Sequence, residues 1–386
     1  MDLARATALL GGLSASKFMV RHWQKKPLLV RAALPDPLSG FDRRRLFALA
    51  ARDGVESRLV ARSGHAWSVR TGPLTRRSLP ALSVPGWSLL VQGVDLHDDA
   101  AHRLLERFRF IPDARLDDVM VSFASDGGGV GPHIDSYDVF LLQLAGRRRW
   151  SIGRVARPRL RGDVPLKMLA DFAPRQSFVL DPGDMLYLPP GWGHDGVAVG
   201  ECLTASIGFR AAAAGPLAAS LLQRIAEAAG ADDAAEVASA DRRLYRDSSQ
   251  PATGRPARIP EALQRFAHAA VERLLADRKG RECALGEALS EPKPGTWFER
   301  GAATLRATGV VLDRRTRMLY DDGHVFVNGE SFRAGGRDAT LMRRLADQRR
   351  IDAKGVAGLS AEAHDLLLQW AEAGWCADED SPGKDR

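Results

Sequence analysis

The residues best suited to metal chemistry lie in the segment GGGVGPHIDSYDVF, residues 127–140. In an extended strand, side chains at positions i and i+2 point to the same face, so His133 and Asp135 are predicted to project together while Ile134 turns away. An imidazole and a carboxylate on one face supply two of the three ligands of a 2-His-1-carboxylate site. Such a site leaves metal positions open for a cosubstrate and oxygen, as in non-haem Fe(II) oxygenases.

The third ligand is predicted in DPGDMLYLPPGWGHDG, residues 181–196. Here DMLYL has the composition of a strand, PPGWG is typical of a tight turn, and His194 follows directly. An HxD pair alone is weak evidence, because it arises often by chance. Combined with a preceding glycine-rich run and a PPGWGH turn, it favours a metal site over two ordinary structural histidines.

A glycine-rich run stands before the HxD pair. Its members Gly127, Gly128, Gly129 and Gly131 carry no side chain, so we expect a substrate backbone to be able to approach closely there. A flexible turn is the alternative interpretation.

A cation for an anionic cosubstrate is predicted in GRRRW, residues 146–150. A dicarboxylate that chelates the metal at one end needs a partner for its other carboxylate, and arginine offers a bidentate one. Strand alternation separates Arg148 from Arg147 and Arg149, so Arg148 is the candidate and its two neighbours are expected in solvent. The alternative is that all three are surface charge.

The elements that must position these residues are mostly strands. Between residues 113 and 210, short segments rich in Val, Ile, Phe, Tyr and Leu alternate with turn residues, which predicts a β-sandwich or barrel. Residues 214–290 show apolar residues at helical spacing and predict a helical module that either dimerises or braces the barrel. Residues 296–386 combine a hairpin, turning at Asp321–Gly323, with two helices, which is compatible with a winged-helix-like fold.

The composition is that of an ordinary globular protein, with 45% hydrophobic and 27% charged residues. No apolar run is long enough to span a membrane, and the N-terminus does not have the pattern of a secretory signal, so we expect a cytoplasmic protein. The three cysteines are far apart and predict neither disulfides nor a thiolate zinc site. A net charge of +7 is compatible with an anionic partner, although the basic residues are spread along the chain.

At its motifs the sequence resembles the JmjC-type ribosomal oxygenases of bacteria, and within them the ribosomal-protein arginine hydroxylases. The resemblance is carried by HIDSYDVF, GRRRW and YLPPGWGH, with a further similarity at HWQKKPLLVR, residues 22–31. The C-terminal part is similar in layout only. A departure stands at Ala124, where the family is expected to have a hydroxyl residue, although Ser122 and Ser125 lie nearby.

The resemblance implies an α+β protein built on a double-stranded β-helix, the jelly-roll barrel of the JmjC and cupin proteins. It implies Fe(II) on His133, Asp135 and His194, with 2-oxoglutarate on Arg148 and O2 as the second cosubstrate. The implied reaction is hydroxylation of an arginine side chain in large-subunit ribosomal protein sixteen. The implied organisation is a catalytic domain over 1–212, a helical dimerisation region over 213–295 that makes a homodimer, and a winged-helix-like domain over 296–386.

Residues for an arginine substrate are expected near the metal. The strand LDDVMVSFA places Asp118 and Met120 on one face, and Tyr137 follows Asp135 at the same alternation. Asp118 is predicted to pair with a guanidinium, while Tyr137 and Met120 line its stem and Ser206 adds a hydrogen bond. Core packing is an equal alternative for Met120. Asp138 is expected to face outward, and no protein nucleophile or general base is needed.

Two other functions remain open from the sequence. One is a JmjC oxygenase that acts on a ribosomal histidine or a methyl-lysine; Asp118 favours a cationic side chain, which weakens histidine. The other is a cupin-like, non-catalytic regulator whose winged helix binds nucleic acid, supported by the arginines of LMRRLADQRR, residues 341–350. A solvated helix face explains those arginines better, and nucleic acid is not expected as a substrate.

Overall fold

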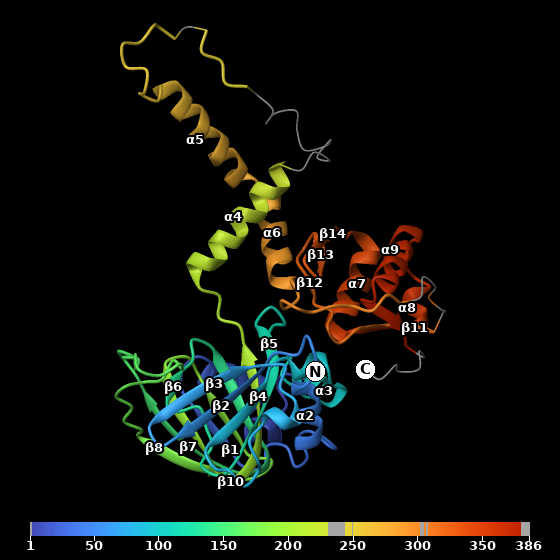
Figure 1. Cartoon of the computed structure of the whole chain (residues 1–386). Coiled ribbons are helices and arrows are strands. Elements are labelled where there is room, and N and C mark those ends of the chain that lie inside the picture. Colours follow the sequence, from blue (N-terminus) through green and yellow to red (C-terminus); the bar gives the residue numbers. More distant parts are fainter. Residues whose placement is uncertain (1, 231–243, 249, 302–304, 306–307, 380–386) are drawn as a thin grey trace. The chain divides into compact units, whose positions relative to one another are not determined.

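The computed structural model describes residues 2–230, 244–248, 250–301, 305 and 308–379. These form two compact units, which are described separately. Unit 1 contains residues 2–211 with the short segment 294–298, and unit 2 contains the described residues of 212–293 and 299–379 (Figure 1). Within the described residues, no helix is both long and apolar enough to cross a lipid bilayer.

Unit 1 opens with short elements that lead into the barrel. They are η1 (Ala8–Leu10), α1 (Ala15–Arg21), β1 (Leu28–Val30), α2 (Arg43–Ala50), β2 (Ser57–Ser63), β3 (Ala66–Thr71), η2 (Arg76–Ser78), β4 (Trp87–Val91), η3 (Val94–Leu96) and α3 (Asp99–Glu106). Each α-helix begins after a side-chain oxygen that accepts a hydrogen bond from a backbone N–H three residues on, from Ser14, Asp42 and Asp98 respectively.

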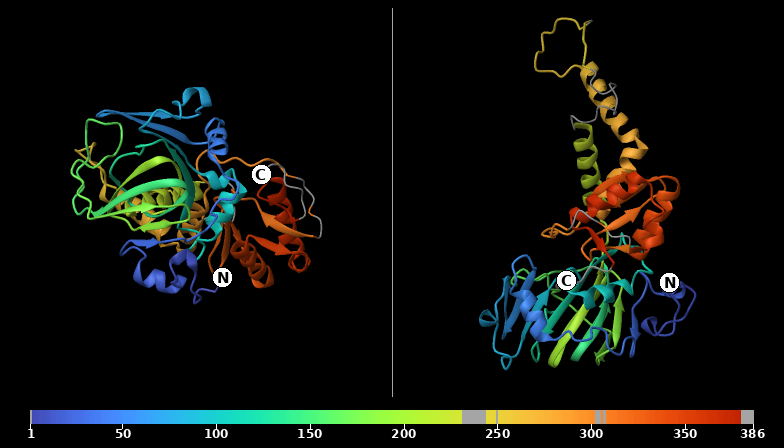
Figure 2. Two further views of the ribbon diagram at one scale, coloured as in Figure 1. Left: turned by 90° about the horizontal axis from the view of Figure 1, so that it is seen from below. Right: turned by 90° about the vertical axis from the view of Figure 1, so that its right-hand side faces the viewer.

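The barrel follows. Its strands are β5 (Leu116–Ala124), β6 (His133–Ile134), β7 (Asp138–Arg154), β8 (Gln176–Leu180), β9 (Met185–Leu188) and β10 (Trp192–Phe209). All pair antiparallel in the order β1-β9-β7-β10-β5-β4-β2-β3, with β6 added to β10 and β8 added to β7. The antiparallel jelly-roll expected from the sequence is confirmed. The left view of Figure 2 shows these strands from below.

The two longest strands each serve both layers of the barrel. The first half of β7 pairs with β9 and the end of β10, whereas its second half pairs with β8 and the start of β10. The change occurs at Gly146, whose φ is +61° and whose site leaves no room for a side chain, since an added Cβ would lie 2.1 Å from the Glu201 carbonyl oxygen. A glycine between two strand-like segments is typical of a turn, but here the chain bends at Gly146 and continues as one strand.

A large aromatic core lies beside the barrel. Phe18, Trp87, Phe123, Phe140 and Phe209 are almost fully buried together with many aliphatic side chains. Burying each such ring stabilises the fold by roughly 2–3 kcal/mol. This core holds β5, β7 and β10 rigidly, and these strands carry the residues of the site.

Unit 2 combines helices with two small sheets. Its elements are α4 (Ala214–Gly230), α5 (Glu261–Ala276), α6 (Arg278–Ser290), β11 (Gly309–Leu312), β12 (Met318–Tyr320), β13 (His324–Val327), β14 (Glu330–Arg333), α7 (Gly336–Gln348), β15 (Arg350–Asp352), α8 (Ala353–Val356), α9 (Ala361–Glu372) and β16 (Cys376–Asp378). The sheets are ordered β15-β11-β16 and β12-β13-β14. The predicted hairpin is β12–β13, and Asp321 caps its turn by accepting from the N–H groups of Gly323 and His324.

The helices of unit 2 differ in how much they bury. Helix α6 packs on the β12–β14 sheet, where Gly286 lies against the Phe326 ring and Ser331 donates a hydrogen bond to Glu287. Helix α5 buries none of its described residues, and Leu263, Val271 and Leu275 are each at least 37% exposed. Helix α5 therefore presents apolar side chains that the described residues do not cover.

Candidate metal centre

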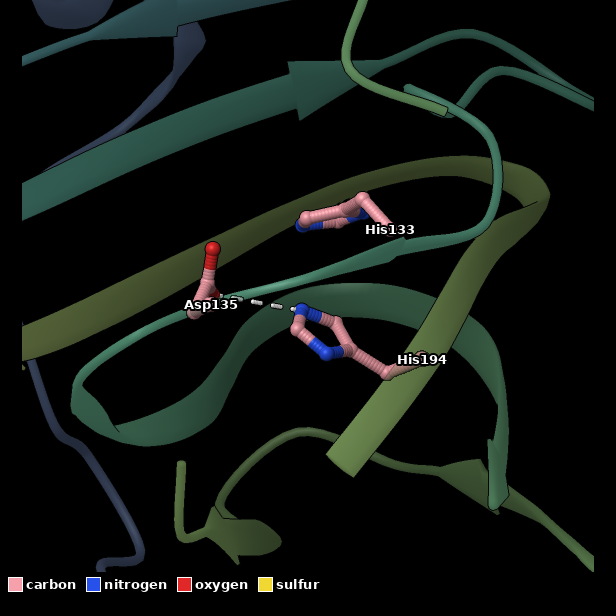
Figure 3. A group of neighbouring side chains, drawn as sticks. All are labelled: His133, Asp135 and His194. Atoms are coloured by element: carbon pink, nitrogen blue, oxygen red, sulfur yellow. Dashed lines mark ion pairs between the residues drawn. The ribbon is translucent and has the colours of Figure 1, made fainter. Parts of the chain in front are cut away.

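His133, Asp135 and His194 come together in unit 1. One ligand atom from each lies within 4.8 Å of the other two, and the two imidazole centroids are 4.1 Å apart. His194 Nε2 lies 3.5 Å from Asp135 Oδ2 (Figure 3). The pairing of β6 with β10 sets His133 directly opposite His194, and Asp135 follows β6 directly, two residues after His133. The antiparallel register thus brings the distant His194 beside the HxD pair.

Main-chain carbonyl oxygens orient both imidazoles. His133 Nδ1 lies 2.9 Å from the Gly131 carbonyl oxygen, and His194 Nδ1 lies 3.1 Å from the Trp192 carbonyl oxygen. With the proton on Nδ1, each ring donates to its carbonyl and keeps the Nε2 lone pair for a ligand bond. The donor set, two neutral imidazole nitrogens and one carboxylate, fits Fe(II) with positions left open.

Burial gives the site the protonation states that a cation needs. It lowers the pKa of His194 well below 6.5, and the nearby His133 lowers it further. Burial also raises the pKa of Asp135, against the influence of His133 and a hydrogen bond from Tyr137. His194 is therefore neutral at neutral pH, and a bound cation would offset the desolvation of the Asp135 carboxylate.

A cavity of about 90 Å³ adjoins the three residues. Arg148 reaches into it from β7 and is only 6% exposed, while Arg147 and Arg149 are exposed as the alternation predicted. The Arg148 guanidinium donates from Nη1 to Ser122 Oγ at 3.3 Å and lies over the Trp150 ring. Its Nε and Nη2 have no hydrogen-bond partner in the described part of the chain. The buried guanidinium is thus poised for a carboxylate.

Ser122 supplies the hydroxyl group near Arg148 that the family was expected to have at the position of Ala124. Ala124 is fully buried in a small apolar cluster with Ala198 and Cys202, away from the cavity lining. Ser122 lines the cavity and contacts Arg148, whereas the Ser125 hydroxyl bonds to the Trp87 main chain. Of the two nearby serines, only Ser122 is placed to contact a ligand.

Three of the four residues predicted to contact the substrate line the cavity. Met120, Tyr137 and Ser206 line the cavity. Asp118 does not: it is buried, and its Oδ2 accepts a hydrogen bond from the Gly93 N–H at 2.8 Å. The pKa of Tyr137 is raised chiefly by burial and then by the nearby carboxylates of Asp135 and Asp118, so Asp118 still acts on the edge of the cavity through its charge.

One other expectation needs correction. Asp138 is fully buried, not outward-facing, because Tyr187 Oη donates to it at 2.6 Å and Gln24 Nε2 at 3.2 Å. Packing of the chain itself also requires glycine in the run: a Cβ on Gly129 would lie 2.6 Å from the Gly196 carbonyl oxygen, and one on Gly128 would lie 2.4 Å from that of Trp87.

Several cavity residues were not anticipated. Ser88 and Leu90 reach the cavity from β4, and Trp150 reaches it from β7. Trp150 shares the strand face of Arg148, so the same alternation could have found it. The β4 residues carry no comparable signal, since only the pairing of β4 with β5 brings them there.

Family models match two parts of the chain: a JmjC domain model matches residues 103–217, and a ROXA-like winged helix model matches residues 274–377. The ribosomal protein uL16 3-hydroxylase of Escherichia coli (strain K12) is 40% identical over 197 residues, which is 50% of this chain and 52% of that relative. In that alignment the chain spans about half of the relative's length. A probable ribosomal oxygenase of Haemophilus influenzae is 29% identical over 93% of this chain and 94% of its own.

Solved structures extend the similarity along the chain. An X-ray structure of E. coli ycfD is similar with a TM-score of 0.81 and 27% identity, covering 94% of this chain and 98% of that one. A structure of E. coli YcfD in complex with cobalt and 2-oxoglutarate is similar with a TM-score of 0.77 and 26% identity, over 94% of this chain and 98% of that one.

Proposed function

Since the chain belongs to the JmjC-type ribosomal oxygenases, we propose that it is an Fe(II)- and 2-oxoglutarate-dependent oxygenase that hydroxylates an arginine side chain of large-subunit ribosomal protein sixteen, uL16. One observation carries the proposal. A 2-His-1-carboxylate set and a buried, incompletely bonded arginine line a single cavity in unit 1. A relative that covers most of this fold binds cobalt and 2-oxoglutarate, which is the ligand pair these residues suit.

His133, Asp135 and His194 would hold the metal, and Arg148 with Ser122 would hold the far carboxylate of 2-oxoglutarate. When bound, Fe(II) with 2-oxoglutarate and O2 supplies the oxidation that turns a C–H bond into C–OH, as 2-oxoglutarate is converted to succinate and CO2. The chain's own part is to fix the imidazole tautomers, to anchor the cosubstrate and to keep bulk water out of the cavity.

A cationic substrate side chain suits the cavity's electrostatics. Tyr137 lines the cavity and is partly exposed, and its pKa is raised by burial and by the nearby carboxylates of Asp135, Asp118 and Asp117. We assign Met120 and Tyr137 to the aliphatic stem of the arginine and Ser206 to a hydrogen bond. Asp118 is assigned to the guanidinium through its charge, since one of its oxygens already accepts from Gly93.

The remaining organisation is part of the same proposal. The catalytic part is 1–212, the dimerisation region 213–295 and the winged-helix part 296–386. The exposed apolar side chains of α5 support a homodimer, because a second copy would remove them from water. A ribosomal-protein substrate places the enzyme in the cytoplasm.

The nucleic-acid regulator is less well supported, because the arginines of residues 341–350 are engaged within unit 2. Arg343 donates to the carbonyl oxygens of Asp321 and Asp322, Arg344 pairs with Asp352, and Arg349 donates to the carbonyl oxygens of Asp313 and Thr316. These contacts hold the unit together and reduce the number of arginines in this segment that are available for binding in a nucleic-acid groove.

The test is 2-oxoglutarate turnover by the Fe(II)-loaded protein with a uL16 arginine peptide. We expect peptide-stimulated succinate and a +16 Da arginine, both lost in His133→Ala and Arg148→Ala and retained in the exposed control Arg149→Ala. The same mass spectra separate hydroxylation of arginine from a modified histidine or a demethylated lysine. Absence of both succinate and bound Fe(II) in the unaltered protein would refute the proposal.

A further inference from the structure

A second cavity lies behind the metal centre. It measures about 440 Å³ and is lined by Asp195 and Val197 of β10, the strand whose His194 and Gly196 face the first cavity. Because side chains alternate along a strand, the two cavities occupy opposite faces of the same wall. Gly129 lines both, so their lining surfaces meet at the glycine-rich run.

Two segments close the second cavity. The β2–β3 hairpin contributes Arg62, His65 and Trp67, and the connection between β7 and β8 contributes Arg161, Met168 and Phe172. These segments belong to unit 1, where β2 and β3 extend the sheet beyond β4 (Figure 1). Neither takes part in holding the metal or Arg148.

The polar groups of this cavity include a donor and an acceptor that the protein does not use. The Oδ1 atom of Asp195 is buried and has no hydrogen-bond partner in the described residues. Arg62 is exposed, lies over the Trp67 ring at 5.8 Å, and has no carboxylate at ion-pair distance among the residues the structure describes. Arg161, by contrast, is already paired with Asp163 at 2.6 Å.

We infer that this second cavity binds the polypeptide substrate at residues flanking the hydroxylated side chain, an inference that rests on the proposed function. A peptide unit presents a carbonyl oxygen, which Arg62 can bind, and an N–H group, which Asp195 Oδ1 can accept. A nucleic-acid strand would satisfy Arg62 with phosphate but would place negative charge beside Asp195. The pairing of one cation with one buried carboxylate therefore favours a polypeptide.

Because Gly129 lines both cavities, one polypeptide could contact the two cavities at the same time. A chain whose target side chain enters the first cavity can pass the glycine-rich run and reach Arg62 and Trp67 at the hairpin tip. Contacts that lie outside the first cavity do not touch the reacting carbon, so they are expected to bind the ground state and the transition state equally. They should therefore act on peptide affinity and KM, with kcat unchanged.

The experiment compares two fluorescent uL16 peptides on the full-length protein, loaded with Fe(II) and 2-oxoglutarate and kept free of oxygen. The short peptide has one residue on each side of the target arginine, and the long one extends by about six residues each way, roughly 20 Å of extended chain. Affinity is measured by fluorescence anisotropy for the unaltered protein, Arg62→Glu, Trp67→Ala and the control Arg70→Glu. Arg70 lies on the same hairpin, and alternation directs it to the opposite face.

We expect Arg62→Glu to weaken the long peptide about tenfold and Trp67→Ala severalfold, with the short peptide and the control unchanged. Unchanged affinity of Arg62→Glu for the long peptide overturns the inference, as does equal affinity of the unaltered protein for both peptides. Loss of single-stranded RNA binding in Arg62→Glu, with peptide binding intact, would reassign the cavity to nucleic acid. Admitting oxygen then tests the proposed function separately: Arg62-dependent binding without a +16 Da product leaves this site standing and refutes the oxygenase.

Discussion

A guanidinium buried with two of its nitrogens unbonded costs the folded protein free energy, and Arg148 is in that position. Desolvating an arginine without a full set of acceptors is unfavourable by a few kcal/mol. The cost is recovered only when a carboxylate enters the cavity. Arg148 therefore lowers the stability of the ligand-free protein while it raises the affinity for a carboxylate ligand.

Replacing Arg148 with Met tests both effects, on the stability of the ligand-free protein and on the affinity for 2-oxoglutarate. We expect the metal-free, ligand-free variant to be more stable than the unaltered protein by about 1–3 kcal/mol, because a neutral side chain of similar length replaces an unsatisfied charge. The KM for 2-oxoglutarate should rise by about 100-fold or more. Urea denaturation and succinate assays check the two effects, with exposed Arg149→Met as the matched control. A destabilised Arg148→Met protein would contradict the argument.

The buried His194 predicts a pH dependence of the metal-free protein. Its folded pKa is lowered by burial and by His133, so below its unfolded value near 6.5 the unfolded chain binds a proton that the folded chain does not. Stability should therefore fall with pH below that value, by at most about 1.4 kcal/mol per pH unit for one group.

Denaturation of the metal-free protein at about pH 7.5 and about pH 5.5 measures this loss. The variant His194→Gln cannot titrate and should show a loss smaller by roughly 1 kcal/mol. Asp135, whose pKa is raised, contributes with the opposite sign above its ordinary value of 3.8, so the comparison between the two proteins isolates His194. Equal losses in both proteins would show that His194 does not titrate as argued.

The alternation of side chains between the two faces of a strand predicted a residue's position correctly where that position depends only on the strand to which the residue belongs. It separated Arg148 from Arg147 and Arg149, and it put His133 and Asp135 on one face. It failed for Asp138, whose burial depends on Gln24 and Tyr187 arriving from elsewhere in the chain. Local patterns do not contain that information.

Among the elements, the short strand β1 is held to the barrel by a side chain as well as by pairing with β9. Asp184 accepts hydrogen bonds from the N–H groups of Ala32 and Asp181 and pairs with Arg31 at 2.5 Å. Burial raises the Asp184 pKa, but these bonds outweigh it and leave the pKa below its ordinary value.

The variant Asp184→Asn should lose about 1–2 kcal/mol of stability at neutral pH, mostly from the two backbone bonds, since Arg31 is largely exposed. A lowered carboxyl pKa contributes stability above the unfolded value of about 3.8 that is lost as pH falls through the folded value. The difference between the two proteins should therefore shrink in acid. Urea titrations across this range measure it, with the exposed Asp181→Asn as control; a pH-independent difference would contradict the assignment.

The bend in β7 shows why element boundaries were harder to predict than elements. The composition on both sides of Gly146 predicts strands, and glycine is typical of a turn between them. The strand continues through the bend because β10 pairs along both halves. Pairing with a distant strand, not local propensity, decides whether the chain turns back or bends.

At the scale of the whole molecule, the uncovered apolar face of α5 predicts association. Substituting Val271 and Leu275 together with Glu should convert a dimer into a monomer, because each charge would need to be buried unpaired in the interface. Sedimentation velocity measures the mass, and exposed Arg265→Glu is the control on the same helix. A monomeric unaltered protein, or a double variant that still dimerises, would rule out α5 as the interface.

The positive charge of the chain does not by itself identify a partner at this scale. The net charge is compatible with an anionic partner, and many of the arginines in unit 2 are bound by carboxylates and carbonyl oxygens of the same unit. Composition gives the charge and the structure shows how much of it is available. The layout of barrel, helices and winged helix was predictable because each has its own periodicity.

The two main-chain carbonyls that hold His133 and His194 have a consequence for how the centre can evolve. A carboxylate partner could be lost by one codon change, whereas the carbonyls of Gly131 and Trp192 persist whatever amino acid those codons specify. The orientation of the imidazoles therefore depends on the backbone conformation and not on the side chains of residues 131 and 192. In a saturation scan, position 192 should tolerate apolar substitutions that keep the strand and its packing on the neighbouring buried side chains, and Gly131 should be restricted by its φ of +76° and its contact with Met168.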